Sequence, residues 1–228
     1  MNYIVIDLEW NQKINRGSMR ALGEIIEIGA VKMNEEMEIL DELSIVVRPS
    51  VYNGMHPHVK KIVHLDEEAL AKGMRFEDAA AKLRASGLDA FVRQQAAEGK
   101  PLLGICLGMQ MLFEKSFEYG EHEGLGLLKG AVVPMAGKLP EELKIPHMGW
   151  NALQTRPGSL LETVDGQFVY FVHSYYAEGC EDALSAVTDY GIPITAAVEK
   201  GNIYGCQFHP EKSGNLCLKQ MSEAGLAE

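Results

Sequence analysis

The amino-acid sequence predicts an α/β protein in which an antiparallel β-meander precedes a sheet of strands and helices. Short β-rich segments separated by tight turns fill the first 50 residues, and short connections favour antiparallel pairing. From about residue 80 the pattern becomes helix, apolar strand, helix, which is typical of a sheet with parallel strands. We therefore predict two parts, residues 1–78 and 79–228, with no linker composition between them.

The elements follow from the residue patterns in chain order. β-Branched and alternating residues predict strands at 3–7, 24–33 and 42–48, and helical spacing follows over 60–83. A second helix is predicted over 79–98, then a fully apolar strand over 101–106 and a helix over 107–118. Further strands are predicted at 131–134, 167–172, 183–188, 195–199 and 203–208, most of them separated by Gly, Pro and Asp turns.

Composition and charge exclude several classes of protein. With 46% hydrophobic and 23% charged residues over 228 positions, the chain is neither disordered, collagen-like nor a coiled coil. No apolar run approaches the roughly 20 residues of a membrane helix, and the first residues lack signal-peptide features, so we expect a cytoplasmic protein with no membrane contact. Acidic residues outnumber basic ones in both parts, 14 to 9 and 18 to 12, which makes nucleic acid an unlikely partner.

A candidate nucleophile lies where the apolar strand meets the next helix. The segment PLLGICLGMQ places Cys106 between Gly104 and Gly108, and small flanking residues permit a sharp strand-to-helix turn that exposes the side chain. The helix N-terminus would favour the thiolate, and the Leu107 amide is placed to donate to an oxyanion. Taken alone, a cysteine between an apolar strand and a helix is more often a small core residue than a nucleophile; the flanking glycines weaken that interpretation and a partner base would reverse it.

A candidate base lies about 100 residues later, in YGCQFHPEKSG. His209 ends an apolar strand and Glu211 follows two residues on, so both lie on the same side of an extended chain. The carboxylate can then hold the imidazole in one tautomer, as in a catalytic triad. In isolation this pattern also fits an exposed histidine beside a solvated glutamate; together with the cysteine turn it favours catalysis.

Five segments, taken together, resemble a known family. GICLGMQMLFE, PHMGWN, FVHSYY, TAAVEK and YGCQFHPEKSG resemble the class I glutamine amidotransferases over about residues 79–228, and within them the glutaminase subunit of imidazole glycerol phosphate synthase. The resemblance implies a flavodoxin-like sheet. It also implies that Cys106 attacks the side-chain amide of glutamine, His209 moves protons and Glu211 orients His209, with no cofactor.

The same resemblance implies roles for further residues and a partner. Gln110 and Glu118 would hold the amino-acid end of glutamine, and His173, Ser174 and Tyr175 would line its carboxylate. Ammonia would pass to a (β/α)8-barrel cyclase subunit that makes imidazole glycerol phosphate in histidine biosynthesis. Without the family, His147, Trp150 and the aromatic run 168–176 are expected to be strand and core, and Cys180, Cys206 and Cys217 to be packing residues.

The first 78 residues resemble a different family, the DEDD-type 3′–5′ exonucleases with their ribonuclease H-like meander. The strand IDLEW carries Asp7 and Glu9 on one face, where two carboxylates can hold divalent metal. The later aspartate and histidine motifs of that family are missing, so we expect no active nuclease.

The sequence before Cys106 lacks two features that the glutaminase family implies. These are its first strands and the Pro-Gly-Val-Gly-type loop that supplies a second oxyanion donor. We therefore expect a glutaminase sheet with an unpaired edge and lowered activity, because one oxyanion donor contributes about 10²–10³ in rate. The alternatives are a metal-dependent exonuclease, a catalytically impaired chimeric chain, or a protein that binds the cyclase through residues 146–176 without hydrolysing glutamine.

Overall fold

The computed structural model describes residues 3–12, 23–34, 38–50, 55, 57, 59–61, 63, 65–75, 78–79, 82, 85–118, 120–214 and 219–221. Contacts within the chain divide it into two units, Met1–Leu88 and Asp89–Glu228. The predicted boundary after residue 78 lies within the first of these units. Each unit has its own sheet structure and its own apolar core.

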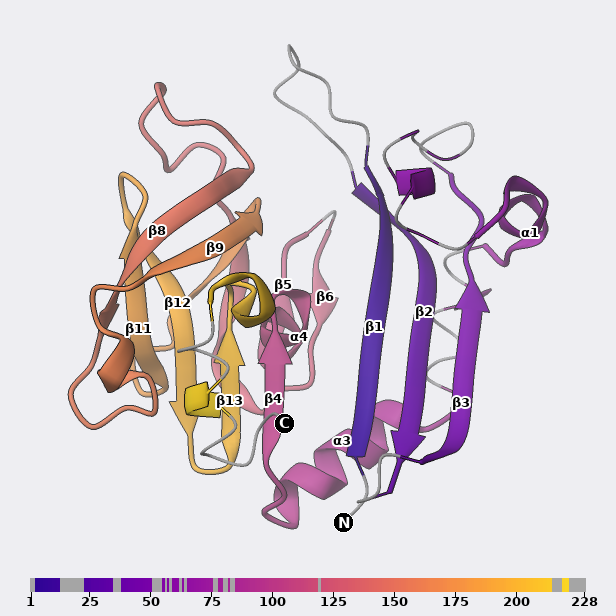
Figure 1. Cartoon of the computed structure of the whole chain (residues 1–228), viewed down its shortest axis with the longest axis horizontal. Helices are drawn as coiled ribbons and strands as arrows, with labels where there is room; N and C mark the ends of the chain where they lie inside the picture. The colour runs from indigo at the N-terminus through magenta and orange to yellow at the C-terminus, as the bar shows by residue number, and fades with distance from the viewer. Residues whose placement is uncertain are drawn as a thin grey trace. The chain divides into compact units, whose positions relative to one another are not determined.

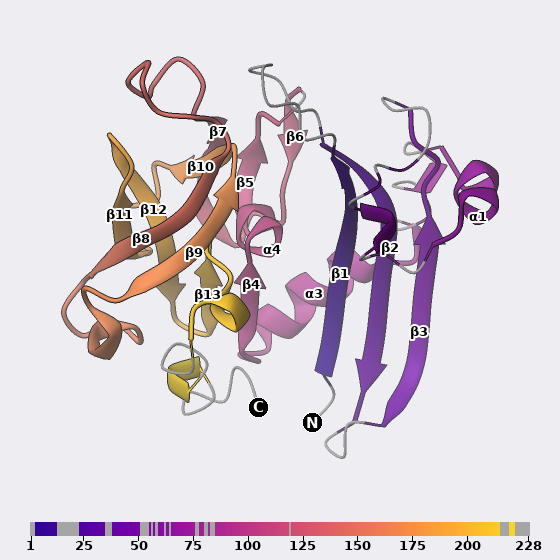
Figure 2. The same cartoon turned by 45° about the horizontal axis from the view of Figure 1, so that its top comes forward.

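Three antiparallel strands form the sheet of the first unit, in the order β1 (Tyr3–Gln12), β2 (Gly23–Met33) and β3 (Ile39–Val46). Figure 2 shows these strands running in alternating directions. The predicted antiparallel meander is therefore confirmed. Ile26 and Leu70 are buried in one core of this unit, and Ile28 and Ile45 in another.

The helical region predicted over 60–83 is confirmed in part. A 3-10 turn η1 (Val59–Lys61) and a short helix α1 (Glu67–Lys72) lie there, and the described residues 78, 79 and 82 are also helical. The Asp66 carboxylate accepts a hydrogen bond from the Ala69 amide and caps the start of α1. The helix ends at Gly73 because the chain turns back to β3 there, where a side chain would meet the Arg48 amide at 2.8 Å.

Among the described residues, the second unit forms two sheets, and helical residues also lie at 219–221. Its elements are α3 (Leu88–Ala97, whose first residue belongs to the first unit), β4 (Leu102–Ile105), α4 (Leu107–Met111), β5 (Phe113–Ser116), β6 (His122–Glu123), β7 (Leu128–Pro134), β8 (His147–Thr155), η2 (Glu162–Val164), β9 (Phe168–His173), β10 (Tyr175–Glu178), β11 (Leu184–Asp189), β12 (Pro193–Lys200), β13 (Ile203–Cys206) and η3 (Pro210–Lys212).

The larger sheet has six strands in the order β4-β13-β12-β11-β8-β9. β4 and β13 pair in parallel, with Gly104 opposite Gly205, and the other pairings are antiparallel. Figure 1 shows β4 and β13 as neighbouring arrows that point the same way. The prediction of a parallel strand over 101–106 is thus confirmed, and in the described part of the chain β4 is the edge of this sheet.

The smaller sheet, in the order β10-β7-β5-β6, corrects the helix predicted over 107–118. The helix ends at Met111, and Phe113–Ser116 forms β5 between β7 and β6. Phe113 is completely buried in the core that this sheet shares with α3. Burial of this ring and the pairing with two strands outweigh a local pattern that favours helix.

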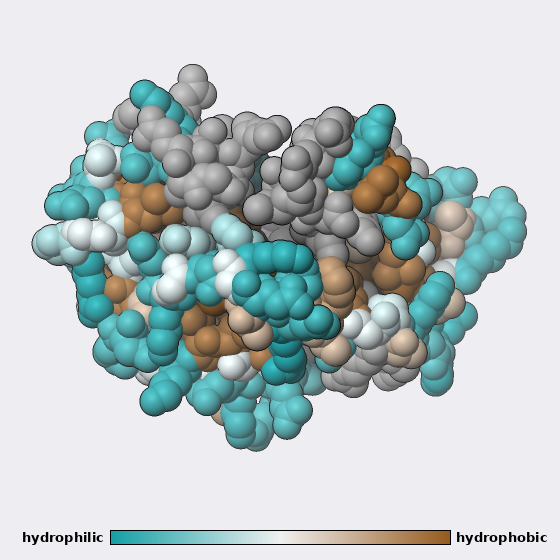
Figure 3. All heavy atoms as spheres, turned by 90° about the horizontal axis from the view of Figure 1, so that it is seen from below, coloured by the Kyte–Doolittle hydropathy of each residue, from teal (hydrophilic) through white to brown (hydrophobic). Residues whose placement is uncertain are grey.

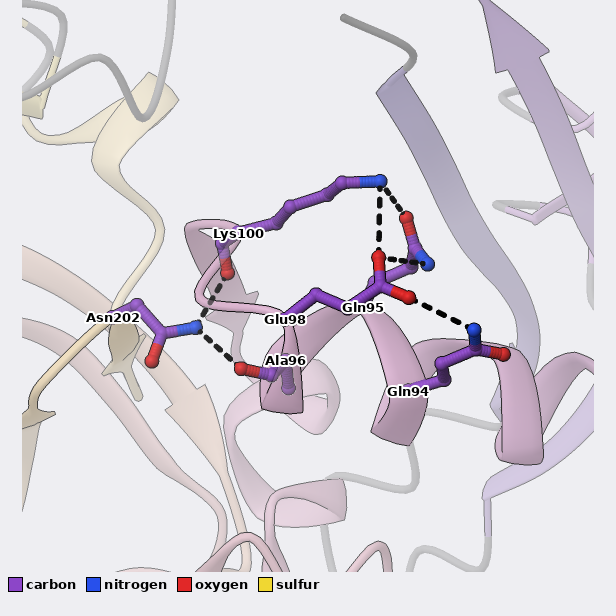
Figure 4. Close-up of polar contacts among 6 residues, drawn as sticks. All are labelled: Gln94, Gln95, Ala96, Glu98, Lys100 and Asn202. Carbon is purple, nitrogen blue, oxygen red and sulfur yellow. Dashed lines mark hydrogen bonds and ion pairs between the residues drawn. The ribbon is translucent and has the colours of Figure 1, made fainter.

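The C-terminal end of α3 is tied to the turn between β12 and β13. The Asn202 side-chain amide donates to the main-chain oxygens of Ala96 at 2.9 Å and Lys100 at 2.6 Å (Figure 4). The Ala96 carbonyl, in the last turn of α3, also accepts a hydrogen bond from the Gly99 amide at 3.0 Å. α3 begins directly after Gly87, whose φ of 72° favours glycine, so it is shorter than the predicted helix 79–98.

The surface mixes polar and apolar residues. On the face shown in Figure 3, hydrophilic residues cover most of the described area and apolar areas lie between them. Phe168 and Trp150 are 62% and 53% exposed, so the core interpretation of the aromatic residues is wrong for these two. No helix in the described ranges is both long enough and apolar enough to cross a membrane.

Candidate active site

Cys106 occupies a strained turn between β4 and α4. Its backbone has φ 52° and ψ −107°, and it is the only non-glycine residue with positive φ in the described part of the chain. Such a conformation costs an L-residue about 1–3 kcal/mol. Gly104 is required here because a Cβ at that position would lie 2.6 Å from Gly108 backbone atoms. The sharp turn predicted from the two glycines is therefore present.

The Cys106 thiol is half-buried, and burial has the largest effect on its ionisation. Desolvation raises the pKa of the thiol to about 11, although hydrogen bonds from the Leu107 amide and the Gln207 side chain act in the opposite direction. The carboxylates of Glu118 and Glu211 raise the pKa further. The helix N-terminus was expected to favour the thiolate, but burial outweighs it and the resting side chain is a neutral thiol.

His209 and Glu211 form the predicted pair just beyond β13. His209 Nδ1 lies 3.0 Å from Glu211 Oε1, and since an ionised carboxylate only accepts hydrogen bonds, Nδ1 carries the proton. The other ring nitrogen, Nε2, is buried and has no hydrogen-bond partner among the described residues. Nε2 is therefore the ring nitrogen that is not engaged by Glu211 and is left for proton transfer.

The parallel pairing of β4 and β13 brings the two catalytic segments to the same edge of the sheet. Ile105 is opposite Cys206, and the Cys106 amide donates to the Cys206 carbonyl at 2.7 Å. Cys106 and His209 each follow the carboxyl end of one of these strands. No hydrogen bond joins the Cys106 thiol to His209 Nε2, and such bonds often tighten only when substrate is bound.

Gln110 and Gln207 connect the thiol to the strand β10. Gln110 Nε2 donates to the Tyr175 main-chain oxygen at 3.0 Å and to Gln207 Oε1 at 2.9 Å. Gln207 Nε2 in turn lies 3.7 Å from Cys106 Sγ. The sequence interpretation missed Gln207. The extended chain expected for His209 and Glu211 is also wrong, because β13 ends at Cys206 and Glu211 lies in the 3-10 turn η3.

The segment 173–175 is held by a second hydrogen-bonded chain. His173 Nδ1 donates to the Tyr175 oxygen at 2.8 Å, and its Nε2 lies 3.0 Å from Nδ1 of His147. Burial lowers the pKa of His173 to about 3, so the ring is neutral, and His147 and His209 lower it further. His147 is stacked between the rings of Phe171 and Tyr190 and was not predicted as a site residue.

The remaining predicted residues are placed as follows. Burial raises the pKa of the Glu118 carboxyl, which follows β5 and acts electrostatically on Cys106. Ser174 accepts a hydrogen bond from the Met135 amide through its main-chain oxygen. Cys180 and Cys206 are buried, as expected of packing residues, and Cys217 lies outside the described residues.

The carboxylate pair predicted in the first unit lies on β1. The backbone places Asp7 opposite Gly29 and Glu9 opposite Glu27. The Asp7 side chain is exposed, and the Glu9 side chain lies outside the described residues. Within the described part of the chain, no group of three or more His, Cys, Asp or Glu residues is arranged to hold a metal ion.

Known solved structures resemble the chain only distantly. A crystal structure of a glutamine amidotransferase covers 63% of this chain and 71% of its own, with 22% identity and a TM-score of 0.47. A full-length 3′-exonuclease covers 36% of this chain and 27% of its own, with 20% identity and a TM-score of 0.31. Likenesses of this size carry no argument about function.

Sequence relatives are much closer. A family model described as "Glutamine amidotransferase class-I" matches residues 80–226, which confirms the resemblance predicted from about residue 79. The imidazole glycerol phosphate synthase subunit HisH of Bacillus licheniformis is 49% identical over 173 residues, covering 73% of this chain and 82% of the relative. The chain therefore belongs to the class I glutamine amidotransferases and, within them, to the family of imidazole glycerol phosphate synthase HisH subunits.

Proposed function

We propose that this chain hydrolyses glutamine to glutamate and ammonia, and that it delivers the ammonia to a cyclase subunit in histidine biosynthesis. One observation carries the proposal. Cys106 and His209 follow the carboxyl ends of two paired parallel strands, and His209 is bound to Glu211 through Nδ1 while Nε2 has no partner among the described residues. A cysteine and a histidine that follow the same edge of a sheet, with one ring nitrogen of the histidine left for proton transfer, are the groups that nucleophilic catalysis by a thiol requires.

The reaction then proceeds in two balanced steps. Cys106 Sγ attacks the side-chain amide carbon of glutamine, and its proton passes through His209 Nε2 to the nitrogen that leaves as ammonia. The product is a glutamyl thioester. Water adds to the thioester carbon, His209 takes a proton from it, and the C–S bond breaks to release glutamate and return the proton to Cys106. Glu211 stabilises His209 whenever the ring is protonated.

The surrounding residues fit roles in binding and in oxyanion stabilisation. We assign the Leu107 amide as one oxyanion donor, since it already faces the sulfur. Glu118 and the segment of His173, Ser174 and Tyr175 would hold the amino and carboxylate ends of glutamine. All the reacting groups are side chains of the chain or water, so the proposed reaction uses no cofactor.

The proposed partner is a (β/α)8-barrel cyclase that uses ammonia to make imidazole glycerol phosphate, in the cytoplasm. The relative from Bacillus licheniformis carries the name of a synthase subunit, and this supports a partner for the present chain. Copurification with the cyclase tests this part of the proposal. Binding without release of glutamate would favour the interpretation as a binding subunit alone.

Substitution of the nucleophile tests the glutaminase assignment. Cys106→Ala is expected to lower glutamate release, measured with the cyclase present, by at least about a thousandfold, because no acyl-enzyme can form. Cys180→Ala is the control, since Cys180 is a buried cysteine whose thiol contacts Thr195. Ordinary turnover by Cys106→Ala would refute the assignment of the nucleophile.

A further inference from the structure

The hydrogen bonds around Gln207 have a fixed direction that can be read from one main-chain oxygen. The Tyr175 carbonyl can only accept, so the side-chain atom of Gln110 that lies 3.0 Å from it is the amide nitrogen. That nitrogen has two hydrogens, and the second points to Gln207 at 2.9 Å. The atom of Gln207 that faces Gln110 is therefore its oxygen.

The orientation of Gln207 follows from that of Gln110. With its oxygen facing Gln110, Gln207 must turn its amide nitrogen towards Cys106, and this nitrogen lies 3.7 Å from Sγ. The oxygen and nitrogen of a side-chain amide are usually hard to tell apart. Here they are assigned because the first acceptor is the Tyr175 carbonyl, which cannot donate. Gln207 is completely buried and Gln110 is 7% exposed, so water does not compete for either amide.

We propose that Gln207 is a positioning residue for the nucleophile, and that the Tyr175 carbonyl, acting through Gln110, holds its N–H towards the Cys106 sulfur. The inference rests on the proposed function, in which Cys106 is the nucleophile. An N–H donor stabilises a thiolate more than a thiol, so this contact offsets part of the cost of forming a buried thiolate. The charged groups that face the sulfur, Glu118 and Glu211, have the opposite effect.

Alkylation of Cys106 by iodoacetamide at a fixed pH tests the proposal, because only the thiolate reacts. Gln207→Met removes the donor at similar side-chain size and is expected to slow the reaction by about tenfold, the effect of one pKa unit on the thiolate fraction. Peptide mass spectrometry separates Cys106 from the other cysteines. Gln154→Met, the same substitution at an exposed position of β8, should leave the rate unchanged.

The direction of the change separates this role from simple structural support. A variant that merely loosened the fold would expose Cys106 and the buried Cys180 and Cys206 and would speed their alkylation. A rate for Cys106 that is unchanged or faster in Gln207→Met would overturn the proposal. If Gln207→Met does not fold, Gln207→Leu provides the same test, because it also has no N–H to donate and adds no charge beside the sulfur.

A double substitution tests the relay itself. Gln110→Met should also slow alkylation, because Gln207 is then no longer oriented. The double variant should be no slower than Gln207→Met alone, since residues that act through one contact are not additive. Additive slowing would overturn the relay. Failure of the unaltered chain and its cyclase to release glutamate would be a separate result, seen in the turnover assay, and would contradict the proposed function instead.

Discussion

At the scale of single residues, two buried groups that are neutral at physiological pH surround the reaction. The Cys106 thiol has a pKa raised to about 11 and the His173 imidazole a pKa lowered to about 3, both mainly by burial. The resting site therefore holds a thiol rather than a thiolate–imidazolium pair. In the proposed mechanism, charge forms there when the thiol proton moves to His209, and a thiol in the resting site is less open to alkylation and oxidation than a thiolate.

The buried His173 predicts how stability depends on pH. The unfolded chain binds a proton at His173 near pH 6.5 but the folded chain does so only near pH 3, so the free energy of unfolding falls as the pH drops from about 6.5 towards 3. One such group gives a slope of about 1.4 kcal/mol per pH unit. Urea denaturation at several pH values measures it.

The variant His173→Gln measures how much His173 contributes to the pH dependence of the free energy of unfolding. It should unfold more easily at neutral pH, by about 1–3 kcal/mol, because the Tyr175 oxygen and His147 lose a partner. Its free energy of unfolding should nevertheless depend less steeply on pH between 6.5 and 3. His122→Gln, on an exposed residue of β6, is the control for loss of an imidazole. Equal slopes in His173→Gln and the unaltered chain would show that His173 does not titrate as described.

At the scale of elements, the turn between β4 and α4 stores strain at the nucleophile. The backbone of Cys106, with φ 52° and ψ −107°, is readily adopted by glycine and disfavoured by residues with a Cβ. We therefore expect Cys106→Gly to be more stable than Cys106→Ala by about 1 kcal/mol, the strain that remains after the greater chain entropy of unfolded glycine is subtracted. Urea denaturation of the two variants gives the difference directly.

The same pair of residues at a helical position provides the control. Ala96→Gly in α3 should lower the free energy of unfolding by about 1 kcal/mol, because glycine is a poor helix former. The sign of the Ala-to-Gly difference should thus be opposite at 96 and 106. If glycine also destabilised position 106, the turn would not be strained, and the conformation of Cys106 would need another cause.

The elements also show what the sequence can and cannot predict. The strands over 24–33 and 195–199 have clear patterns, and the structure has β2 and β12 there. β5 was missed because Phe113 is buried in a core that includes Val198 of β12 and Ile203 of β13, far along the chain. The proposed triad of Cys106, His209 and Glu211 could be assigned from the sequence because its chemistry is local to two motifs. Gln207 and His147 were not, because their roles depend on partners 101 and 26 residues away.

At the scale of the whole molecule, the two units have separate apolar cores. Ile26 and Leu70 belong to a core within the first unit, and Leu153 and Phe171 to one within the second. Denaturation of such a chain need not be a single two-state transition. The stability of the proposed active site should therefore depend on the apolar cores of the second unit and not on those of the first.

Hydrogen exchange of the full chain, followed by mass spectrometry, tests this separation. Ile26→Ala removes a buried side chain at a cost of about 2–5 kcal/mol and should speed exchange in β1, β2 and β3 but not in β4, β12 or β13. Leu153→Ala, a matched truncation in the second unit, should give the reverse pattern. Faster exchange in β4 and β13 of Ile26→Ala would mean that the two cores unfold together.

The pairing of β4 with β13 also determines where the chain tolerates changes of length. The nucleophile and the base are brought together by four paired positions, from Leu102 opposite Ile203 to Ile105 opposite Cys206, and not by the hundred residues between them. Insertions in an exposed turn such as Pro157–Gly158 leave that alignment as it is. A one-residue deletion within β13 shifts its side chains to the opposite face of the sheet and moves His209 relative to Cys106, so length is least free to vary in the short stretch from Ile203 to His209.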